Sequence, residues 1–266
     1  MKRETPAARA PAAKKRFGQH FLHDPRVIER IVRAVDPQPG ETLVEIGPGL
    51  GALTRPLLER AGRLHVIEID RELLPPLREV CGDAPGLTIH AADALRFDFA
   101  RLAEDGSPLR LVGNLPYNIS TPLLFHVLEF ASRIRDMHFM LQKEVVERIV
   151  AAPGAAAYGR LTATLAARAQ ASALFTVAPG AFRPPPQVES AVLRLVPRPP
   201  PFPLASLAAY DRIVTAAFAQ RRKTLANALR GSLSADAIAA AGVDPRARAE
   251  TLAPADFARL ADACPA

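Results

Sequence analysis

Short hydrophobic runs and amphipathic segments of helical length alternate over most of this chain. Six apolar runs are typical of buried strands: 43–46, 64–69, 87–90, 109–112, 137–141 and 191–196. Apolar residues three and four positions apart predict helices at 25–35, 52–60, 123–128 and 161–169. Asp24 followed by Pro25 is a good helix start, and Ser120 or Thr121 is the expected cap of the third helix. Strands that alternate with helices predict an α/β fold built on a parallel sheet.

The pattern changes near residue 200. Four of the five residues from 199 to 203 are prolines, which is typical of a boundary. Beyond them the periodicity is helical, at 204–229, 236–241 and 254–263. Residues 1–16 are mostly alanine, proline and basic residues, which predicts a disordered basic arm. We therefore expect three parts: the arm at 1–16, an α/β domain at 17–200 and a small all-helical domain at 201–266.

The 266 residues carry a formal net charge of +7, which favours a polyanionic partner such as a nucleic acid. Two cysteines, Cys81 and Cys264, give neither a disulfide framework nor the spacing of a metal site, so we expect no metal and a reducing compartment. No apolar run approaches the length that spans a membrane, and no signal-peptide pattern precedes the first motif. We therefore expect a cytoplasmic protein without a membrane partner.

A glycine-rich loop follows the first predicted strand of the sheet. The strand at 43–46 runs into Gly47-Pro48-Gly49-Leu50-Gly51 and then a helix, which is the first unit of nucleotide-binding α/β folds. The glycine spacing is not that of a dinucleotide site, and the acidic Glu45 precedes the loop. A cationic cofactor without a phosphate fits better, so we predict S-adenosylmethionine, whose sulfonium is positively charged.

Further carboxylates follow the next two strands at the same edge. Glu68 stands 21 positions after Gly47, where an acidic residue accepts from ribose hydroxyls. Asp70 is more simply the N-cap of a helix that begins at Arg71. Asp93 is placed to accept from an adenine amine, although it is equally an ordinary turn carboxylate.

The apolar run at 109–112 leads to Asn114-Leu115-Pro116-Tyr117. Asn114 offers a side-chain acceptor, and the carbonyl of Leu115 or Pro116 offers a second, because a residue before proline is biased to extended backbone. Tyr117 adds a flat ring that can stack on a base. Two acceptors holding both N–H groups of an exocyclic amine would direct its lone pair at an electrophile, without a strong base. The alternative is an ordinary strand-ending turn.

Three other segments carry candidate chemistry, each with a plain structural alternative. Phe17–Leu22 could drape over a ligand pocket, or it could only pack against the following helix. Phe182, at the root of a stiff triple-proline loop, could stack on the target base opposite Tyr117, or it could lie in the core. Arg221-Arg222-Lys223, on a predicted helix, could hold RNA phosphates, or it could be a solvated face.

In these motifs the chain resembles the ribosomal RNA adenine dimethyltransferases, and most closely their bacterial small-subunit branch. The resemblance runs from about Phe17 to the C-terminal helices, and it rests on five stretches together: Phe17–Leu22, Val44–Gly51, Asn114–Ser120, Met140–Val145 and Phe182–Ser190. It implies a Rossmann-like S-adenosylmethionine-dependent methyltransferase domain and a small helical domain. It implies cofactor binding by His20, Leu22, Gly47, Glu68, Asp93 and Asn114.

The reaction implied by the resemblance is the transfer of four methyl groups, two to each of two adjacent adenosines in the 3′-terminal hairpin loop of 16S rRNA. The implied substrate is the immature 30S subunit, for which the protein would also be a biogenesis factor, and we expect it to act as a monomer. Three rival functions remain: a 23S-directed methyltransferase, a DNA adenine methyltransferase, and an RNA-binding assembly or transcription factor that has lost catalysis.

One position departs from the family pattern. His20 stands where the family often has asparagine, and an imidazole titrates near neutrality. If the imidazole contacts the cationic cofactor, its protonation should weaken binding, so cofactor affinity would fall below about pH 6.5. An affinity that stays flat through that range would contradict this hypothesis.

Overall fold

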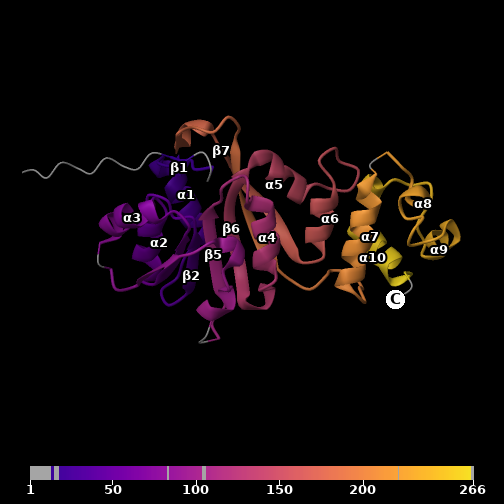
Figure 1. Cartoon of the computed structure of the whole chain (residues 1–266), viewed down its shortest axis with the longest axis horizontal. Helices are drawn as coiled ribbons and strands as arrows, with labels where there is room; N and C mark the ends of the chain where they lie inside the picture. The colour runs from indigo at the N-terminus through magenta and orange to yellow at the C-terminus, as the bar shows by residue number, and fades with distance from the viewer. Residues whose placement is uncertain (1–12, 15–17, 83, 104–105, 221, 265–266) are drawn as a thin grey trace, which may run out of the picture. The chain divides into compact units, whose positions relative to one another are not determined.

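The computed structural model describes residues 13–14, 18–82, 84–103, 106–220 and 222–264, and Figure 1 traces the chain by colour. The chain forms two compact units. The first consists of Met1–Gln142 and Leu174–Val192, and the second of Lys143–Ala173 and Leu193–Ala266. The second unit therefore begins well before residue 201, where the sequence predicts a domain boundary. That 17–200 and 201–266 are separate domains stays a prediction. Most of the predicted arm at 1–16 lies outside the described residues.

The first unit is built on parallel strands and helices. The strands are β2 (Thr42–Ile46), β3 (Leu64–Glu68), β4 (Leu87–Ala91), β5 (Leu109–Asn114) and β6 (Ile134–Gln142). The helices are α1 (Pro25–Val35), α2 (Thr54–Ala61), α3 (Leu74–Cys81) and α4 (Ser120–Leu128). Short 3-10 turns lie at Arg71–Leu73, Ala94–Arg96, Phe99–Leu102, Ala131–Arg133 and Pro179–Ala181. β2 pairs in parallel with β3 and β5, β3 with β4, and β5 with β6, which confirms the predicted α/β class.

The strand order creates a crevice at one edge of the sheet. Within the described residues the order is β4-β3-β2-β5-β6-β9-β7, where β7 is Ala169–Val177 and β9 is Ser190–Pro197. Because β2 lies between β3 and β5, the strand order reverses there, and open α/β sheets bind ligands at the carboxyl ends beside such a switch point. Two short antiparallel strands, β1 (Phe21–Leu22) and β8 (Phe182–Arg183), join the segment before α1 to the loop before β9.

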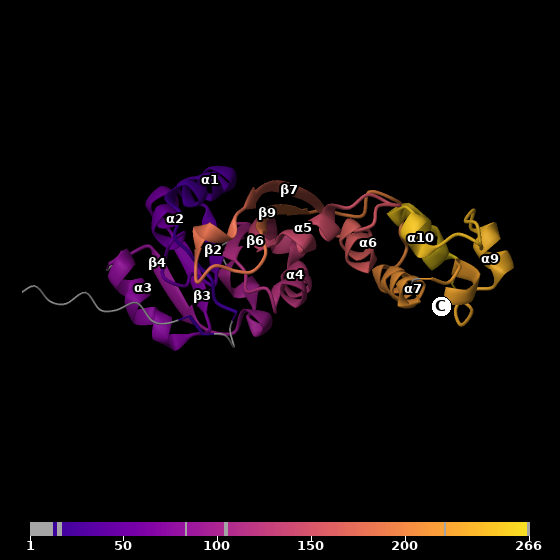
Figure 2. The same cartoon turned by 90° about the horizontal axis from the view of Figure 1, so that it is seen from above.

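Both faces of the central parallel strands β2, β3, β5 and β6 are largely buried, whereas the edge strand β4 is partly exposed. Leu43 of β2 and Leu64 of β3 pack with Ile31 of α1 and Leu57 of α2 in one core cluster. Val44, the next residue along β2, points to the other face and is just as buried. Figure 2 shows α1 and α2 on one side of the strands and α4 on the other. Coverage of both faces explains why these strands have continuous apolar runs rather than alternating patterns.

A buried ion pair closes the amino end of the sheet. Arg110, near the start of β5, is only 5% exposed, and its guanidinium donates to both carboxylate oxygens of Asp136 at 2.8 and 3.0 Å. It also donates to the Glu41 carboxylate at 2.7 Å and to the carbonyls of Val35 and Asp36 at the end of α1. One guanidinium thus joins β5, β6 and the end of α1.

One detail of the first unit differs from the sequence-based expectation. The cap of α4 is Ile119, which makes no side-chain capping bond, so the prediction of a Ser120 or Thr121 cap is wrong. Ser120 instead donates its hydroxyl to the carbonyl of Tyr117 at 3.1 Å. The residue therefore stabilises the turn that follows β5 rather than the helix end.

Helices are the main regular elements of the second unit. They are α5 (Lys143–Val150), α6 (Arg160–Ala166), α7 (Leu207–Ala219), α8 (Leu225–Ala228), α9 (Ala235–Ala240) and α10 (Pro254–Asp262), with a 3-10 turn at Ala249–Thr251. Buried tyrosine hydroxyls tie them together: Tyr158 donates to the Leu252 carbonyl and Tyr210 to the Ala163 carbonyl, both at 2.8 Å. The prediction of a single helix over 204–229 is wrong, because α7 ends at Ala219 and α8 begins at Leu225.

Candidate functional site

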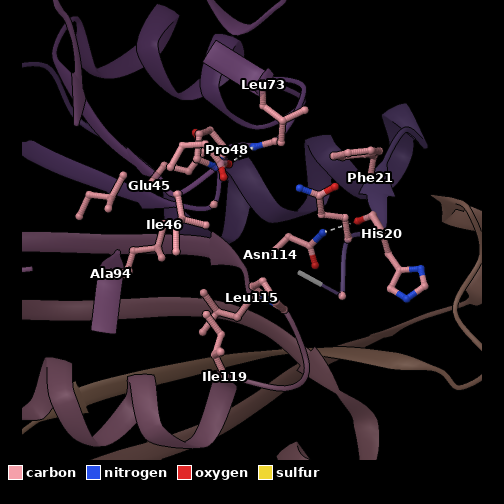
Figure 3. Close-up of a pocket in the computed structure, with 18 of the residues that line it drawn as sticks. His20, Phe21, Glu45, Ile46, Pro48, Leu73, Ala94, Asn114, Leu115 and Ile119 are labelled. Carbon is pink, nitrogen blue, oxygen red and sulfur yellow. Dashed lines mark hydrogen bonds between the residues drawn. The ribbon is translucent and has the colours of Figure 1, made fainter. Parts of the chain in front are cut away.

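A cavity of about 270 Å³ opens at the carboxyl ends of β2, β3 and β5, where the strand order predicts a crevice (Figure 3). Its walls come from the glycine loop after β2, the turns after β3 and β4, the loop after β5, and residues 18–22. The predicted site residues that line it are His20, Leu22, Gly47, Glu68, Asp93, Asn114, Leu115, Pro116 and Tyr117. The fold therefore gathers these candidates from separate segments into one concave site.

The glycine loop places main-chain atoms, not covered by side chains, at the wall of the cavity. Gly47 has a φ of +68°, a left-handed conformation that side chains other than glycine rarely adopt. Gly49 has a φ of +57°, and a Cβ added there would lie 3.1 Å from the Phe21 ring. Glycine at these positions lets the loop pack closely against β1 and leaves backbone atoms accessible to a ligand.

Glu68 and Asp93 present carboxylates at the ends of neighbouring strands. Glu68 accepts from the N–H of Gly49 at 3.3 Å and of Asp70 at 2.8 Å, so its side chain is held at the rim of the glycine loop. Burial raises the pKa of Glu68, against the lowering effect of these backbone hydrogen bonds. Asp93 accepts from the N–H of Leu95 at 2.9 Å, so it is a turn carboxylate that also lines the cavity.

Sequence reasoning did not include Glu45 among the site residues. This side chain lines the cavity, is only 2% exposed, and its Oε2 has no hydrogen-bond partner among the described residues. Burial raises the pKa of Glu45 to about 8. A lone glutamate within the apolar run at 43–46 is the signal that could have identified it, because a buried strand seldom holds an acid without a partner.

Asp70, next to the cavity-lining residue Ile69, makes contacts that the sequence did not predict. Asp70 accepts from Lys14 Nζ at 2.8 Å and from Gln19 Nε2 at 3.0 Å. Although burial opposes it, these hydrogen bonds lower the pKa of Asp70. Asp70 also accepts from the N–H of Glu72, as predicted for an N-cap. These contacts hold the segment before β1 against the turn after β3.

Asn114 has a defined orientation at the end of β5. Its Nδ2 lies 2.8 Å from the backbone carbonyl of His20, and a carbonyl only accepts, so the amide nitrogen must face it. Oδ1 is then left as an acceptor, with no donor among the described residues. The Pro116 carbonyl accepts from the N–H of Ile119 at 3.2 Å, whereas the Leu115 carbonyl accepts from no described residue. Two free acceptors therefore stand on successive residues.

Contacts from distant segments hold Tyr117. Its hydroxyl shares a hydrogen bond of 2.7 Å with the hydroxyl of Ser190, at the start of β9. Its ring is stacked with the His20 imidazole, with centroids 5.6 Å apart and planes 28° apart. Burial raises the pKa of Tyr117, against the lowering effect of the Ser190 hydrogen bond, so the hydroxyl stays protonated near neutral pH.

The imidazole of His20 contacts the loop after β8 and the ring of Tyr117. Its Nδ1 lies 2.8 Å from the backbone carbonyl of Pro184, while the carbonyl of His20 itself faces Asn114 (Figure 3). The main chain of this residue therefore meets the cavity, and the ring joins Tyr117 to the loop after β8.

Phe182 lies in the core rather than beside the cavity. Its ring is 2% exposed and belongs to the cluster that includes Leu22 and Val192. The prediction that it stacks on a target base is therefore not supported, and the alternative of a core side chain holds. The physical reason is the pairing of β1 with β8, which sets Phe182 opposite Leu22.

The predicted RNA-binding residues belong to the second unit. Arg221 lies outside the described residues, and Arg222 and Lys223 are exposed in the connection between α7 and α8. The expectation that they stand on a helix is wrong for these two. Among the described residues, no three histidine, cysteine or acidic side chains come together as metal ligands. In the same part of the chain, no helix combines the length and hydrophobicity needed to cross a membrane.

Known proteins similar to this chain agree on one family. The model of the family described as "Ribosomal RNA adenine dimethylase" matches residues 11–264. Ribosomal RNA small subunit methyltransferase A of Aromatoleum aromaticum is 57% identical over 249 residues, covering 93% of this chain and 92% of that protein. The protein of the same name from Thiobacillus denitrificans is 58% identical over 245 residues, covering 92% and 94%.

Solved structures agree on the fold. The 23S rRNA methyltransferase ErmE is 28% identical, with a TM-score of 0.73 over 91% of this chain and 98% of that one. A dimethyladenosine transferase from Plasmodium falciparum is 24% identical, with a TM-score of 0.77 over 91% and 96%. The parallel sheet, the cavity at its switch point and these matches together show that the chain belongs to the ribosomal RNA adenine dimethylase family and is an rRNA adenine dimethyltransferase.

Proposed function

We propose that this enzyme uses S-adenosylmethionine to dimethylate two adjacent adenosines in the 3′-terminal hairpin loop of 16S rRNA, within the immature 30S subunit. The small subunit is favoured because relatives above 50% identity over more than 90% of the chain are named small-subunit methyltransferases. The observation that carries the chemistry is the oriented pair of acceptors, Asn114 Oδ1 and the Leu115 carbonyl.

The residues around the cavity suit a cationic nucleoside. Glu45 Oε2 has no hydrogen-bond partner among the residues that the structure describes, and a positive charge bound nearby would favour the ionised carboxylate. The Glu68 carboxylate is held where ribose hydroxyls can donate to it. Ile69 lines the cavity with a side chain that is 50% exposed, an apolar surface against which an adenine ring can pack, with Asp93 in reach of its amine.

Backbone would complete the cofactor site. Gly47 and the main chain of His20 and Leu22 line the cavity and would contact the remainder of the molecule. When bound, S-adenosylmethionine supplies an electrophilic methyl group on its sulfonium. The proposal uses no metal ion.

The acceptors would orient the adenine amine. An aromatic amine is a poor nucleophile because its lone pair is delocalised into the ring. Asn114 Oδ1 and the Leu115 carbonyl would accept from its two N–H groups and favour a pyramidal nitrogen whose lone pair faces the methyl group. The amine proton becomes acidic once the nitrogen is methylated and can pass to water, so placement rather than acid–base chemistry supplies the catalysis.

Tyr117 would hold the base during transfer. The target adenosine must leave its stack to reach the cavity, as base-modifying enzymes generally require. A ring anchored through Ser190 offers a stable surface on which the base can stack. Monomethyladenosine must bind for the second transfer, so one acceptor loses its N–H partner in that round.

Contacts with RNA beyond the target adenosine are proposed from the charge of the chain. The net charge of +7 favours a polyanionic partner, and Arg221, Arg222 and Lys223 would contact phosphates of the subunit. We further propose that the enzyme acts as a cytoplasmic monomer and as a biogenesis factor of the small subunit.

The test is transfer of labelled methyl groups from S-adenosylmethionine to three substrates: unmethylated 30S subunits, naked 16S rRNA and 50S precursors. Label in dimethyladenosine only with 30S would support the proposal. Label with 50S precursors would favour a 23S-directed enzyme. Tight 30S binding without transfer would indicate an assembly factor that has lost catalysis.

A further inference from the structure

The side chain of His20 joins two parts of the site that come from distant segments. Its imidazole is stacked with the ring of Tyr117, with centroids 5.6 Å apart. Its Nδ1 lies 2.8 Å from the Pro184 carbonyl, and because a carbonyl only accepts, Nδ1 carries the proton. This hydrogen bond sets the plane of the imidazole, and the stack in turn constrains the ring of Tyr117.

The loop before β9 is attached to this pair at both of its ends. Pro184, at its beginning, accepts from His20, and Ser190, at its end, shares a hydrogen bond with Tyr117. Ser190 is fully buried, so its end of the loop is anchored in the sheet. Tyr117 is therefore held along its plane by the hydroxyl and against its face by the imidazole.

The backbone carbonyl of His20 has a different function from the side chain. Its backbone carbonyl accepts from Asn114 Nδ2 and keeps Asn114 Oδ1 free. A substitution of the side chain leaves this carbonyl in place. The two functions of the residue can therefore be separated by mutation.

We propose that the imidazole of His20 is a positioning element for the target adenosine, which acts by holding Tyr117, and that it takes no part in binding the cofactor. This rests on the proposed function, in which Tyr117 stacks on the base. It replaces the sequence-based hypothesis that the imidazole contacts the cofactor.

Three variants separate the effect of the aromatic ring from the effect of the hydrogen-bond donor. His20→Phe keeps a ring but removes the donor to Pro184. His20→Asn keeps a donor of similar reach but removes the ring. His20→Ala removes both. Each variant is measured for cofactor affinity by calorimetry, and for kcat and KM with unmethylated 30S subunits by labelled methyl transfer.

Tyrosine signals give a direct readout of the stack. The chain has three tyrosines, of which Tyr158 and Tyr210 lie in the second unit. With 13C-labelled tyrosine, the Tyr117 signal is assigned by Tyr117→Phe. We expect it to move in His20→Ala and His20→Asn, because the ring current of the imidazole is lost, while the Tyr158 and Tyr210 signals stay in place.

We expect the variants to lower the efficiency of RNA methylation without weakening cofactor binding. In His20→Ala and His20→Asn, kcat/KM for 30S should fall about tenfold, the scale of one aromatic pair, while cofactor affinity stays within about twofold. His20→Phe should lose less than about threefold, because the ring is kept. Intact cofactor binding also shows that the variants are folded.

Other outcomes would overturn the proposal. A cofactor affinity that falls about tenfold or more in His20→Phe and His20→Ala, with Tyr117 unmoved in His20→Phe, would assign the imidazole to the cofactor. Unchanged kcat/KM in all three variants would leave it no role in catalysis. A wild-type protein that labels no 30S adenosine would refute the proposed function together with this role, and it is recognised before any variant is compared.

Discussion

The two ends of the parallel sheet both bury ionisable side chains, but the hydrogen-bond partners of these side chains differ. At the amino end, the guanidinium of Arg110 meets two carboxylates and two backbone carbonyls. At the carboxyl end, Glu45 is as deeply buried, yet its Oε2 has no partner among the described residues. Asn114, at the same end, likewise keeps a free acceptor.

The difference indicates what each end does. A buried charge with all its partners joins segments of the chain and needs no ligand. A buried carboxylate without a partner is costly, so it marks a place where a bound molecule can supply the missing interaction. We therefore propose that the amino end of the sheet stabilises the fold and that the carboxyl end binds ligands and reacts. Each of the following predictions tests this division, from the largest expected effect to the smallest.

Breaking the ion pair at the amino end should cost the most stability. Arg110→Met leaves Asp136 buried without its partner, and we expect a loss of about 3–5 kcal/mol in the free energy of unfolding. Cofactor affinity per folded molecule should change little. Chemical denaturation and calorimetry measure the two quantities.

Arg135→Met is the matched control, because Arg135 pairs with Glu41 at the same end but is 57% exposed, so its loss should cost under about 1 kcal/mol. Weakened cofactor binding without destabilisation would contradict the division.

Removing the oriented amide at the carboxyl end should mainly affect turnover. Asn114→Ala should lower kcat about 10²–10³-fold, the usual cost of losing one preorganised hydrogen bond in a reacting site. Cofactor affinity should stay largely intact. Single-turnover methyl transfer and calorimetry test this together. An equal loss of turnover and affinity would argue against separate roles for Asn114 and the cofactor residues.

The buried carboxyl should make cofactor binding depend on pH. Since the pKa of Glu45 is about 8, the carboxyl must lose a proton before it can attract a cation. Affinity should therefore rise between pH 6 and pH 8, by at most about tenfold per pH unit. Calorimetry across this range, in wild type and in Glu45→Gln, measures the slope. A slope that persists in the Glu45→Gln variant would assign it to another group.

The same carboxyl has the opposite effect on the protein without cofactor. Its pKa is raised in the folded state from an ordinary 4.5, so its contribution to stability is present below pH 4.5 and is lost as pH rises through 8. Melting temperatures of wild type and Glu45→Gln should therefore diverge in favour of the variant as pH increases. Parallel melting curves would contradict this.

The smallest effect concerns the anchor of the aromatic ring. Tyr117→Phe removes the hydrogen bond to Ser190, and we expect kcat/KM for the RNA substrate to fall by an amount that corresponds to about 0.5–1.5 kcal/mol. The double variant with Ser190→Ala should be no worse than Tyr117→Phe alone, because the two hydroxyls act through one bond. Strictly additive losses in this cycle would show that the hydroxyls act independently.

Much of the first unit followed from local pattern alone. The apolar runs located β2 to β6, and the glycine loop and the Asn114 motif both stood at strand ends, as predicted. This succeeded because strand formation, turn chemistry and left-handed glycines depend on residues that are close in sequence. The α/β class followed from the same alternation.

Only the tertiary structure decided which side chains have partners. Phe182 was open between core and base in the sequence, and the pairing of β1 with β8 buries it. Likewise, the sequence does not show that the imidazole of His20 lies beside the Pro184 carbonyl. Glu45 and Arg110 are both ionisable side chains within apolar runs, and nothing near them in sequence shows that Arg110 has four partners while one oxygen of Glu45 has none among the described residues. Their partners, or the lack of them, come from segments tens of residues away, and a local pattern holds no information about distances across the fold.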